Sequence, residues 1–439
     1  MKDKKDKKDK QDGTYTFTHR VKVPTTTAEL AAAAERVMGG RLTEVALSDE
    51  QQDAFKKICA WFDTRAAPVL TLGGYAGTGK STLISVLAGK YPHIRIAFCA
   101  LTGKATSVLR KKLVEGNVIA GNHSVSTVHS LMYTPVTDKS LGAITGWERK
   151  DFLDCDLIIL DEASMVDEAI FKDLTSYNIP ILAVGDHGQL PPIQGSFNLM
   201  ERPTLRLETV HRQAEDSPIL ALSAMVRRFG QVPRMEHSLE VQILHITATA
   251  NVVEALYSDK GINHGDVAML CYTNAERCWL NELAREARWG AKDQVPRVGD
   301  LVMCLRNTQA TVFNGMRGTI LELRPEYETE HTYYGRVFFE DDSIEVEGPI
   351  NKAQFGREST FKDFDEYARA THIRPRSWEA VGLLLDYGYT LTVHKSQGSE
   401  FEHTIVVNDF PQRMDLEAKR RTLYTAVTRC SKYLVVLQQ

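Results

Sequence analysis

An apolar run at residues 69–72 leads into the sequence Gly74-Tyr75-Ala76-Gly77-Thr78-Gly79-Lys80-Ser81, and a helix-forming segment at residues 82–87 follows it. This order fits the strand–loop–helix pattern of a phosphate-binding loop, in which glycines let backbone N–H groups surround a phosphate. The positive N-terminal end of the helix points at the same anion. The pattern predicts that Lys80 contacts the β- and γ-phosphates of ATP and that the Ser81 hydroxyl holds Mg²⁺. The alternative is an ordinary glycine-rich turn.

The composition is typical of a globular protein, and a chain of 439 residues predicts several domains. The net charge of −4 does not indicate nucleic-acid binding, although a basic channel can lie inside a nearly neutral protein. The seven cysteines show no C-x-x-C pair, which favours buried reduced thiols over disulfides or zinc. No apolar run approaches the about 18 residues that span a bilayer, and the N-terminus lacks an apolar signal segment. We therefore expect a cytosolic protein without a membrane partner.

Short apolar strands alternate with helices along two parts of the chain. Strands are expected at residues 94–99, 157–160 and 180–184, and again at 267–271, 404–407 and 434–437. This alternation predicts an α/β fold with two parallel sheets, each covered by helices on both faces. Short strands with turn sequences between residues 299 and 346 predict a small β-barrel inserted into the second unit. Residues 1–12 alternate Lys and Asp, which predicts a disordered tail, and residues 28–38 favour a helix.

Polar residues follow the expected strands of the first unit. Asp161-Glu162 ends one of them, where Asp161 would hold Mg²⁺ and Glu162 would polarise the attacking water. A solvated strand end is the alternative for this acidic pair. Gln189 follows the next strand, where its amide could sense the γ-phosphate. Gln51 admits two interpretations, because it completes a capping box with Ser48 and is also placed to pair with an adenine edge.

Gln189 lies within Gly185-Asp186-His187-Gly188-Gln189-Leu190-Pro191-Pro192, which resembles motif III of superfamily 1 helicases of the RecD/Dda/Pif1-like branch. Other stretches resemble further motifs of that family in the expected order: Thr102-Gly103-Lys104-Ala105, Ser126-Thr127-Val128-His129-Ser130-Leu131, Val210-His211-Arg212-Gln213, Thr392-Val393-His394-Lys395-Ser396-Gln397-Gly398-Ser399-Glu400 and Leu423-Tyr424-Thr425-Ala426-Val427-Thr428-Arg429. The sequence departs from the family pattern at Leu101, where proline is usual, and at Cys430-Ser431. The resemblance covers roughly residues 47–437, and the short chain is most similar to the small phage Dda-type or RecD-like members, without a long N-terminal domain.

The resemblance implies an ATP-dependent DNA helicase of superfamily 1B with two RecA-like domains. Arg212 and Arg429 would reach from the second domain to the γ-phosphate as arginine fingers, so that ATP closes the cleft between the domains and hydrolysis opens it. An ordinary surface arginine is the alternative for each. Gly398 would belong to the nucleotide site. The family branch also implies 5′-to-3′ movement on single-stranded DNA.

The resemblance further implies a strand-binding groove made of short polar or basic side chains: Thr102, Lys104, Thr127, His129, Asn274, Thr392, His394 and Ser396. Such side chains suit contacts to phosphate and sugar, although a lone Thr on such a loop is often a helix cap instead. Between two of these motifs, relatives carry a hairpin that separates the DNA duplex. Trp147 is the expected apolar wedge, and packing onto the first α/β unit is its alternative.

The predicted domains are a tail at 1–42, a first RecA-like domain at 43–124 and 151–205, a hairpin insert at 125–150, a second RecA-like domain at 206–302 and 385–439, and an SH3-like insert at 303–384. The expected cofactors are ATP and Mg²⁺. The expected partners are single-stranded DNA and junctions of single- and double-stranded DNA, with a single-strand-binding protein or replisome component as a further candidate. The expected location is the cytosol of a bacterium or phage-infected host. Two rival functions are an RNA helicase on the same fold and a non-catalytic DNA clamp within a larger complex.

Overall fold

The computed structural model describes residues 18–21, 47–116, 118, 122–138, 143–192, 197–210, 217–233, 238–259, 262–290, 292–308, 312, 314–339, 344–376, 378–411 and 413–439. Several predictions lie outside these residues, namely the tail at 1–12, the helix at 28–38 and the side chain of Arg212. The chain divides into two compact units. One comprises Met1–Val23, Pro135–Gly146 and Trp289–Tyr389, and the other comprises Pro24–Thr134, Trp147–Arg288 and Thr390–Gln439.

The larger unit contains two parallel sheets, which confirm the predicted pair of RecA-like domains. The first sheet has the order β4-β3-β7-β8-β2-β9, and each pair of neighbouring strands is parallel. Its strands are β2 (Val69–Gly74), β3 (Ile96–Ala100), β4 (Ser124–Thr127), β7 (Leu157–Leu160), β8 (Ile181–Gly185) and β9 (Leu205–Leu207). Its helices are α2 (Asp49–Thr64), α3 (Lys80–Lys90), α4 (Gly103–Glu115), α5 (Val128–Met132) and α6 (Glu168–Thr175).

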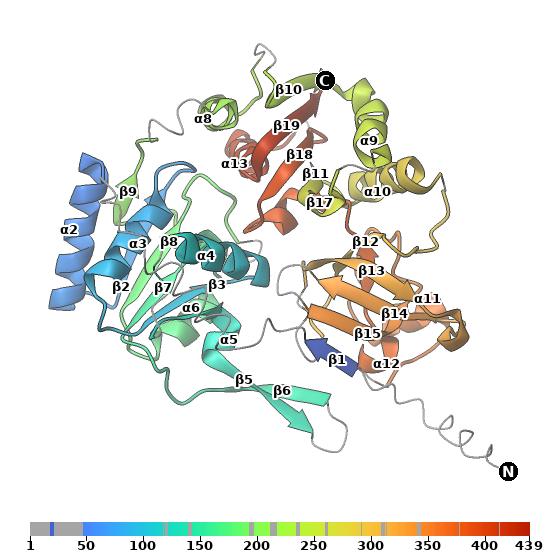
Figure 1. The fold of residues 1–439 in the computed structure, drawn as a ribbon, viewed down its shortest axis with the longest axis horizontal. Coiled ribbons are helices and arrows are strands. Elements are labelled where there is room, and N and C mark those ends of the chain that lie inside the picture. Colours follow the sequence, from blue (N-terminus) through green and yellow to red (C-terminus); the bar gives the residue numbers. More distant parts are fainter. Residues whose placement is uncertain are drawn as a thin grey trace. The chain divides into compact units, whose positions relative to one another are not determined.

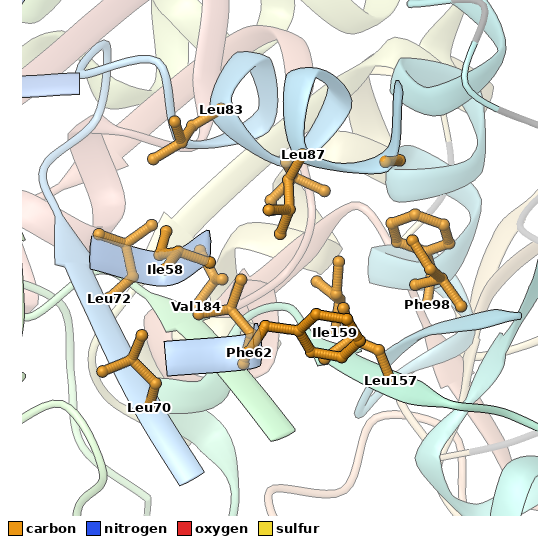
Figure 2. Packing of buried hydrophobic residues seen from close by; sticks show 14 of the residues in the cluster. Ile58, Phe62, Leu70, Leu72, Leu83, Leu87, Phe98, Leu157, Ile159 and Val184 are labelled. Carbon is orange, nitrogen blue, oxygen red and sulfur yellow. The ribbon is translucent and has the colours of Figure 1, made fainter. Parts of the chain in front are cut away.

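The first sheet is buried on both faces by helices. Successive side chains of its strands point in opposite directions, so neighbouring residues of one strand enter different cores. On one face Phe98 joins Leu83 and Leu87 of α3 and Ile58 of α2 in a hydrophobic core (Figure 2). On the other face the neighbouring Ala97 and Cys99 belong to a second core that includes residues of α5 and α6. Both cores hold the carboxyl ends of β2, β7 and β8 in place, and the predicted site residues follow these ends.

The second sheet has the order β10-β19-β18-β11-β17, and it is also parallel throughout (Figure 1). Its strands are β10 (Val241–His245), β11 (Val267–Cys271), β17 (Thr390–Thr392), β18 (Phe401–Val407) and β19 (Cys430–Gln438). Its helices are α8 (Pro218–Phe229), α9 (Thr249–Ser258), α10 (Asn274–Trp289) and α13 (Leu416–Val427). Helix α13 packs against α8, and the chain then turns directly from α13 into β19.

Between α5 and β7 the chain forms a two-stranded sheet of β5 (Tyr133–Asp138) and β6 (Ala143–Arg149). The base of this hairpin is held by Tyr177, whose hydroxyl lies within hydrogen-bond distance of the carbonyl oxygens of Met132 (3.1 Å) and Lys150 (2.9 Å). The Arg149 guanidinium lies 4.5 Å from the centre of the same tyrosine ring. The hairpin therefore leaves the first sheet from a fixed base.

The smaller unit is built on a six-stranded sheet of order β1-β15-β14-β13-β12-β16, and every pair in it is antiparallel. Its strands are β1 (Thr18–Val21), β12 (Leu301–Cys304), β13 (Arg317–Leu323), β14 (Thr332–Phe339), β15 (Ile344–Asn351) and β16 (Leu385–Tyr387). Two helices, α11 (Phe364–Thr371) and α12 (Trp378–Val381), accompany it. The unit includes more of the sequence than the predicted insert at 303–384, because β12 begins before residue 303 and β16 follows residue 384. The predicted tail also contributes β1, and the SH3-like assignment stays a prediction.

Candidate functional site

The loop between β2 and α3 has the backbone that its glycines predict. Gly77 and Gly79 adopt left-handed φ angles of 78° and 75°, a region that glycine enters without a steric penalty. A Cβ atom at Gly74 would lie 2.7 Å from Thr78 Oγ1, so the first glycine lets the loop curl tightly. Lys80 is the first residue of α3, and its Nζ donates to the carbonyl oxygens of Gly74 (2.7 Å) and Tyr75 (2.9 Å). The lysine is therefore held across the mouth of the loop.

Helix α2 braces this loop. The predicted capping box is confirmed, since the Ser48 N–H donates to Gln51 Oε1 (3.0 Å) and the Gln51 N–H donates to Ser48 Oγ (3.3 Å). The Nε2 atom of the buried Gln51 amide donates to the Thr78 carbonyl oxygen at 3.1 Å. The sequence did not predict this contact with the loop. Contact with an adenine edge stays a prediction. The neighbouring Glu50 accepts from the N–H groups of Glu208 and Thr209, both at 3.0 Å, and so fixes the segment that leaves β9.

Asp161 and Glu162 follow β7, as predicted. Glu162 has a φ of 51°, an uncommon conformation for a residue with a side chain, and such residues concentrate at functional sites. Asp161 Oδ1 accepts from the Glu162 N–H at 2.9 Å. Burial raises the pKa of the Glu162 carboxyl above 4.5, and the charge of Arg429 opposes this shift. A carboxylate with a raised pKa is a stronger base than an ordinary glutamate, which suits proton abstraction from water.

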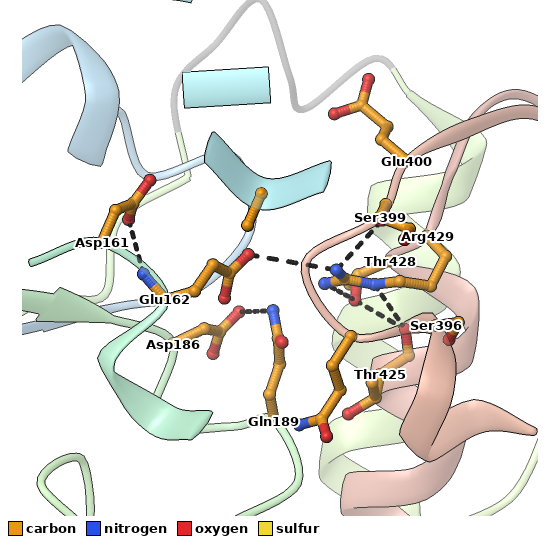
Figure 3. Close-up of polar contacts among 12 residues, drawn as sticks. Asp161, Glu162, Asp186, Gln189, Ser396, Ser399, Glu400, Thr425, Thr428 and Arg429 are labelled. Carbon is orange, nitrogen blue, oxygen red and sulfur yellow. Dashed lines mark hydrogen bonds and ion pairs between the residues drawn. The ribbon is translucent and has the colours of Figure 1, made fainter. Parts of the chain in front are cut away.

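Gln189 lies beside this pair at the end of β8. Its Nε2 is 3.4 Å from Asp186 Oδ2, and its Oε1 is buried without a hydrogen-bond partner among the described residues. Figure 3 shows Asp161, Glu162, Asp186 and Gln189 gathered opposite Arg429 and its neighbours. The structure thus brings together the predicted catalytic side chains of the first domain.

Arg429 reaches the same place from the second sheet. Its guanidinium is almost fully buried and donates to the carbonyl oxygens of Thr425 (3.2 Å) and Ser399 (3.1 Å). Its Nη1 lies 4.0 Å from Glu162 Oε1, so the arginine faces the carboxylate that is predicted to activate water (Figure 3). The surface-arginine alternative is wrong for this residue in the structure. The other predicted finger, Arg212, lies outside the described residues.

Further polar contacts cross between the two parallel-sheet domains, and the sequence interpretation did not assign them. Gln397 Nε2 donates to the Leu190 carbonyl oxygen (2.9 Å), and the Leu190 N–H donates to Thr425 Oγ1 (3.1 Å). Arg421 Nη1 donates to the Gln189 carbonyl oxygen at 3.2 Å. All of these side chains lie within or beside stretches that resemble family motifs, which is the only signal in the sequence that could have found them.

Gly398 also lies where the domains meet, but against the start of α4. With a φ of 71°, its Cβ position is 2.9 Å from the Ala105 Cβ and 3.3 Å from Thr102 Oγ1. No residue of the phosphate-binding loop is among these nearest neighbours. The glycine allows two segments to approach each other closely, and its contact with nucleotide stays a prediction.

The predicted strand-binding residues divide into groups with different surroundings. Thr102 and Thr127 cap helices, because each side chain accepts a backbone N–H, from Ala105 and Ser130 respectively. The capping alternative is therefore confirmed for both. Ser396 is fully buried and donates to the Val393 carbonyl oxygen, so its hydroxyl is not available to a ligand in this conformation.

The other predicted strand-binding residues are near aromatic rings or at element ends. Lys104 Nζ lies 5.0 Å from the centre of the Phe401 ring, and the His129 ring stacks near Tyr133 at 6.0 Å. Burial lowers the pKa of both His129 and His394, so each imidazole is neutral at pH 7. A neutral imidazole suits stacking or hydrogen bonding to sugar rather than charge pairing with phosphate. Thr392 ends β17, and Asn274 begins α10.

Trp147 lies on β6, and its surface is 49% exposed. Packing onto the first α/β unit, the alternative named for this residue, is at most partial, because about half of the side chain is exposed. Exposure alone does not establish a wedge, and that role stays a prediction.

The AAA domain family matches residues 46–249, and the UvrD-like helicase C-terminal domain family matches residues 387–437. The ATP-dependent RecD2 DNA helicase of Deinococcus radiodurans is 29% identical over 385 residues, which cover 82% of this chain and 46% of that protein. The ATP-dependent DNA helicase Dda of Enterobacteria phage T4 is 27% identical over 195 residues, covering 41% of this chain and 42% of Dda. The sequence is thus similar to superfamily 1B helicases of the RecD/Dda-like branch.

A solved structure of Pif1 helicase from Bacteroides, in complex with ADP-AlF3 and ssDNA, is 17% identical to this chain, with a TM-score of 0.48. That match covers 90% of this chain and 92% of the Pif1 chain. The chain spans less than half of the length of the RecD2 helicase that it matches. In the part of the chain that the structure describes, no helix is long and apolar enough to cross a membrane.

The residues at this site are suited to binding Mg²⁺. Within the described ranges no group of three or more His, Cys, Asp or Glu side chains forms a metal cage. Mg²⁺ does not need such a cage, because it keeps several waters and is bound through one or two protein oxygens together with substrate phosphates. The Ser81 hydroxyl at the start of α3 and the Asp161 carboxylate directly after β7 would supply oxygen ligands of this kind.

Proposed function

We propose that this chain is an ATP-dependent DNA helicase that translocates on single-stranded DNA, 5′ to 3′, and separates duplex DNA at a junction. The observation that carries the proposal is the position of Arg429 beside Glu162. A phosphate-binding loop and a water-activating carboxylate come from one parallel-sheet domain, and the arginine comes from the other. Hydrolysis that needs groups from both domains is coupled to their closure, which is the basis of a motor.

In the proposed reaction a water molecule attacks the γ-phosphorus of ATP, the bond to the ADP oxygen breaks, and ADP and phosphate leave. Glu162 accepts a proton from the attacking water, which its raised pKa favours. Lys80 and the loop N–H groups hold the β- and γ-phosphates, and Arg429 stabilises the charge of the transferred group. Ser81 and Asp161 would hold Mg²⁺, which would further neutralise the phosphate charge when it is bound.

The DNA strand is proposed to cross both domains along the segments that resemble the DNA-contacting motifs. Of the predicted residues, Lys104, His129, His394 and Asn274 are proposed to contact the strand. The buried Ser396 is not, because its hydroxyl donates to the Val393 carbonyl oxygen. The proposed contacts are to sugar and phosphate, so binding is independent of base sequence. The hairpin of β5 and β6, with the exposed Trp147, is proposed to separate the duplex.

We also propose a cytosolic location. All seven cysteines lie within the described ranges, none of them forms a disulfide and six are buried, as expected for a reducing compartment. A single-strand-binding protein or a replisome component is the proposed protein partner.

A strand-displacement assay with 5′-tailed and 3′-tailed duplexes tests the proposed function. We expect ATP-dependent separation of the 5′-tailed duplex and little separation of the 3′-tailed one. Lys80→Ala, measured in parallel, controls for unwinding by passive binding. Stimulation of ATP hydrolysis by poly-U as strong as that by poly-dT would favour an RNA helicase, and stable DNA binding without ATP hydrolysis would indicate a clamp. Binding to oligo-dT is expected to weaken with salt at a log–log slope of about −0.7 for each phosphate neutralised.

A further inference from the structure

Tyr424 crosses from the second domain into the nucleotide site of the first. It lies on α13, the helix that leads to Arg429, and it is almost completely buried. Its hydroxyl donates to Asp186 Oδ2 at 2.7 Å and accepts from the Ala76 N–H at 2.8 Å. One hydroxyl of the second domain is therefore bonded both to the phosphate-binding loop and to the carboxylate that follows β8.

The ring of Tyr424 has little freedom to move within this site. A Cβ atom at Gly188 would lie 3.0 Å from Tyr424 Cε1 and 3.1 Å from Tyr75 Cε1, so both tyrosine rings pack against that glycine. The two rings meet edge to face at 6.2 Å, and the Arg227 guanidinium covers Tyr75 at 3.3 Å. Packing thus fixes the position of the hydroxyl, and a change that removes only its oxygen would keep the ring in place.

Asp186 connects this hydroxyl with Gln189. One carboxylate oxygen accepts from the Gly188 N–H at 2.9 Å, and the other faces both the Tyr424 hydroxyl and Gln189 Nε2, the latter at 3.4 Å. An ionised carboxylate can only accept hydrogen bonds, so the amide must turn its nitrogen toward Asp186. Gln189 Oε1 is then directed away from Asp186, and it is buried without a partner among the described residues.

The orientation of that amide decides what Gln189 can bind. An amide oxygen accepts a hydrogen bond from water but is repelled by a phosphate oxygen, whereas the amide nitrogen donates a hydrogen bond to either. Gln189 in this orientation therefore suits the attacking water beside Glu162. This differs from the γ-phosphate contact predicted from the sequence.

We propose that Tyr424 is a positioning residue for ATP hydrolysis, which acts through Asp186 to turn the Gln189 amide oxygen toward the attacking water when α13 docks on the first domain. Because α13 leads directly to Arg429, docking brings the arginine and orients Gln189 in one movement. When α13 withdraws, Asp186 loses the hydroxyl donor and the loop loses its tie at Ala76. This inference rests on the proposed ATPase function.

Tyr424→Phe tests the inference, since it removes one oxygen and keeps the ring. We expect the DNA-stimulated kcat to fall by about 10- to 100-fold, the range for loss of a hydrogen bond to a charged group, while the KM for ATP stays within about twofold. Tyr257→Phe is the matched control, because Tyr257 is an equally buried tyrosine on α9 of the same domain, and its ring stacks near His264. The control is expected to retain wild-type kcat. Thermal unfolding of both variants checks folding.

Double variants separate positioning from a general structural effect. Adding Tyr424→Phe to Gln189→Ala should lower kcat no further than Gln189→Ala alone, because the hydroxyl would act through that amide. The same non-additivity is expected with Asp186→Asn. Additive losses in both pairs would overturn the inference.

Other results would also contradict it. A Tyr424→Phe protein with wild-type DNA-stimulated kcat would overturn it, as would a loss confined to the KM for ATP. Either result in the presence of an active wild-type enzyme leaves the proposed function intact. A wild-type protein without DNA-stimulated ATP hydrolysis would overturn both.

Discussion

Arg429 Nη1 lies 4.0 Å from Glu162 Oε1, and each side chain is positioned by its own domain. The arginine is bonded to the carbonyl oxygens of Thr425 and Ser399, and Glu162 is directed by a left-handed backbone after β7. The two groups belong to different parallel sheets, so each is placed by the core of its own domain. Their proximity defines where the γ-phosphate of ATP would have to react.

We expect Lys80→Ala to abolish turnover and weaken nucleotide binding, because the β- and γ-phosphate charge loses the lysine of the loop. Glu162→Gln should bind ATP but hydrolyse it at least about 100-fold more slowly, since an amide cannot accept the proton of water. Nucleotide-binding titration and single-turnover hydrolysis measure the two effects separately. Near-normal single-turnover hydrolysis by Glu162→Gln would show that the carboxylate is not the base.

Arg429→Ala should lose most DNA-stimulated turnover, by about 10³-fold or more, and retain much of its ground-state ATP binding. The reason is that an arginine finger acts mainly on the transition state. Arg420→Ala is the control, because Arg420 lies on α13, the helix that leads to Arg429, and pairs with the exposed Glu417 instead. If the two variants showed equal turnover, Arg429 would be no finger.

The pH dependence of turnover should reveal the raised pKa of Glu162. Burial raises this pKa above 4.5, and Arg429 opposes the shift. Because a base must be deprotonated, kcat should fall as the pH drops through the raised pKa, so the acid limb should lie above pH 4.5. The Lys80 charge also lowers this pKa, and the Asp161 and Asp186 charges raise it.

Arg429→Gln removes a charge that lowers the pKa of Glu162. The acid limb of its residual activity should therefore move to higher pH than in the wild type. Single-turnover rates across the pH range measure both profiles, and an unchanged limb would contradict the electrostatic coupling of the two residues.

Gly398→Ala should disturb the contact between the two domains. A methyl group at this position would lie 2.9 Å from the Ala105 Cβ, and the φ of 71° adds backbone strain. Gly290→Ala is a matched control, because Gly290 has a φ of 65° but no atom within 4 Å of its Cβ position. We expect both variants to lose about 1 kcal/mol of stability from the backbone, and only Gly398→Ala to lose DNA-stimulated turnover. Equal turnover in the two proteins would show that the close approach is unimportant.

Trp147→Ala should keep DNA-stimulated ATP hydrolysis and reduce duplex separation, if the hairpin is the wedge. The side chain is half exposed on β6, so its removal should leave the core of the first domain intact. Stopped-flow measurements of ATP hydrolysis and unwinding on the same preparation compare the two activities. Equal loss of both, in a normally folded variant, would rule out the wedge assignment.

The sequence by itself determined the parts that depend on local geometry. The glycines of residues 74–81, the capping pair Ser48 and Gln51, and the polar ends of β7 and β8 follow from residue type and spacing, because a loop or cap involves neighbours in the chain. The alternation of apolar strands and helices likewise predicted both parallel sheets. The order of the motifs then identified the family.

Only the tertiary structure decided which distant groups meet. The contacts of Arg429 with Glu162 and of Tyr424 with Asp186 join residues on different sheets, and packing of two separate cores sets their distances. The second bond of the Gln51 amide, to Thr78, likewise needs α2 to dock beside the loop. The antiparallel unit extends beyond residues 303–384 because β12 and β16 pair with each other. A strand joins the sheet that offers hydrogen-bond partners to its backbone, whatever its place in the sequence.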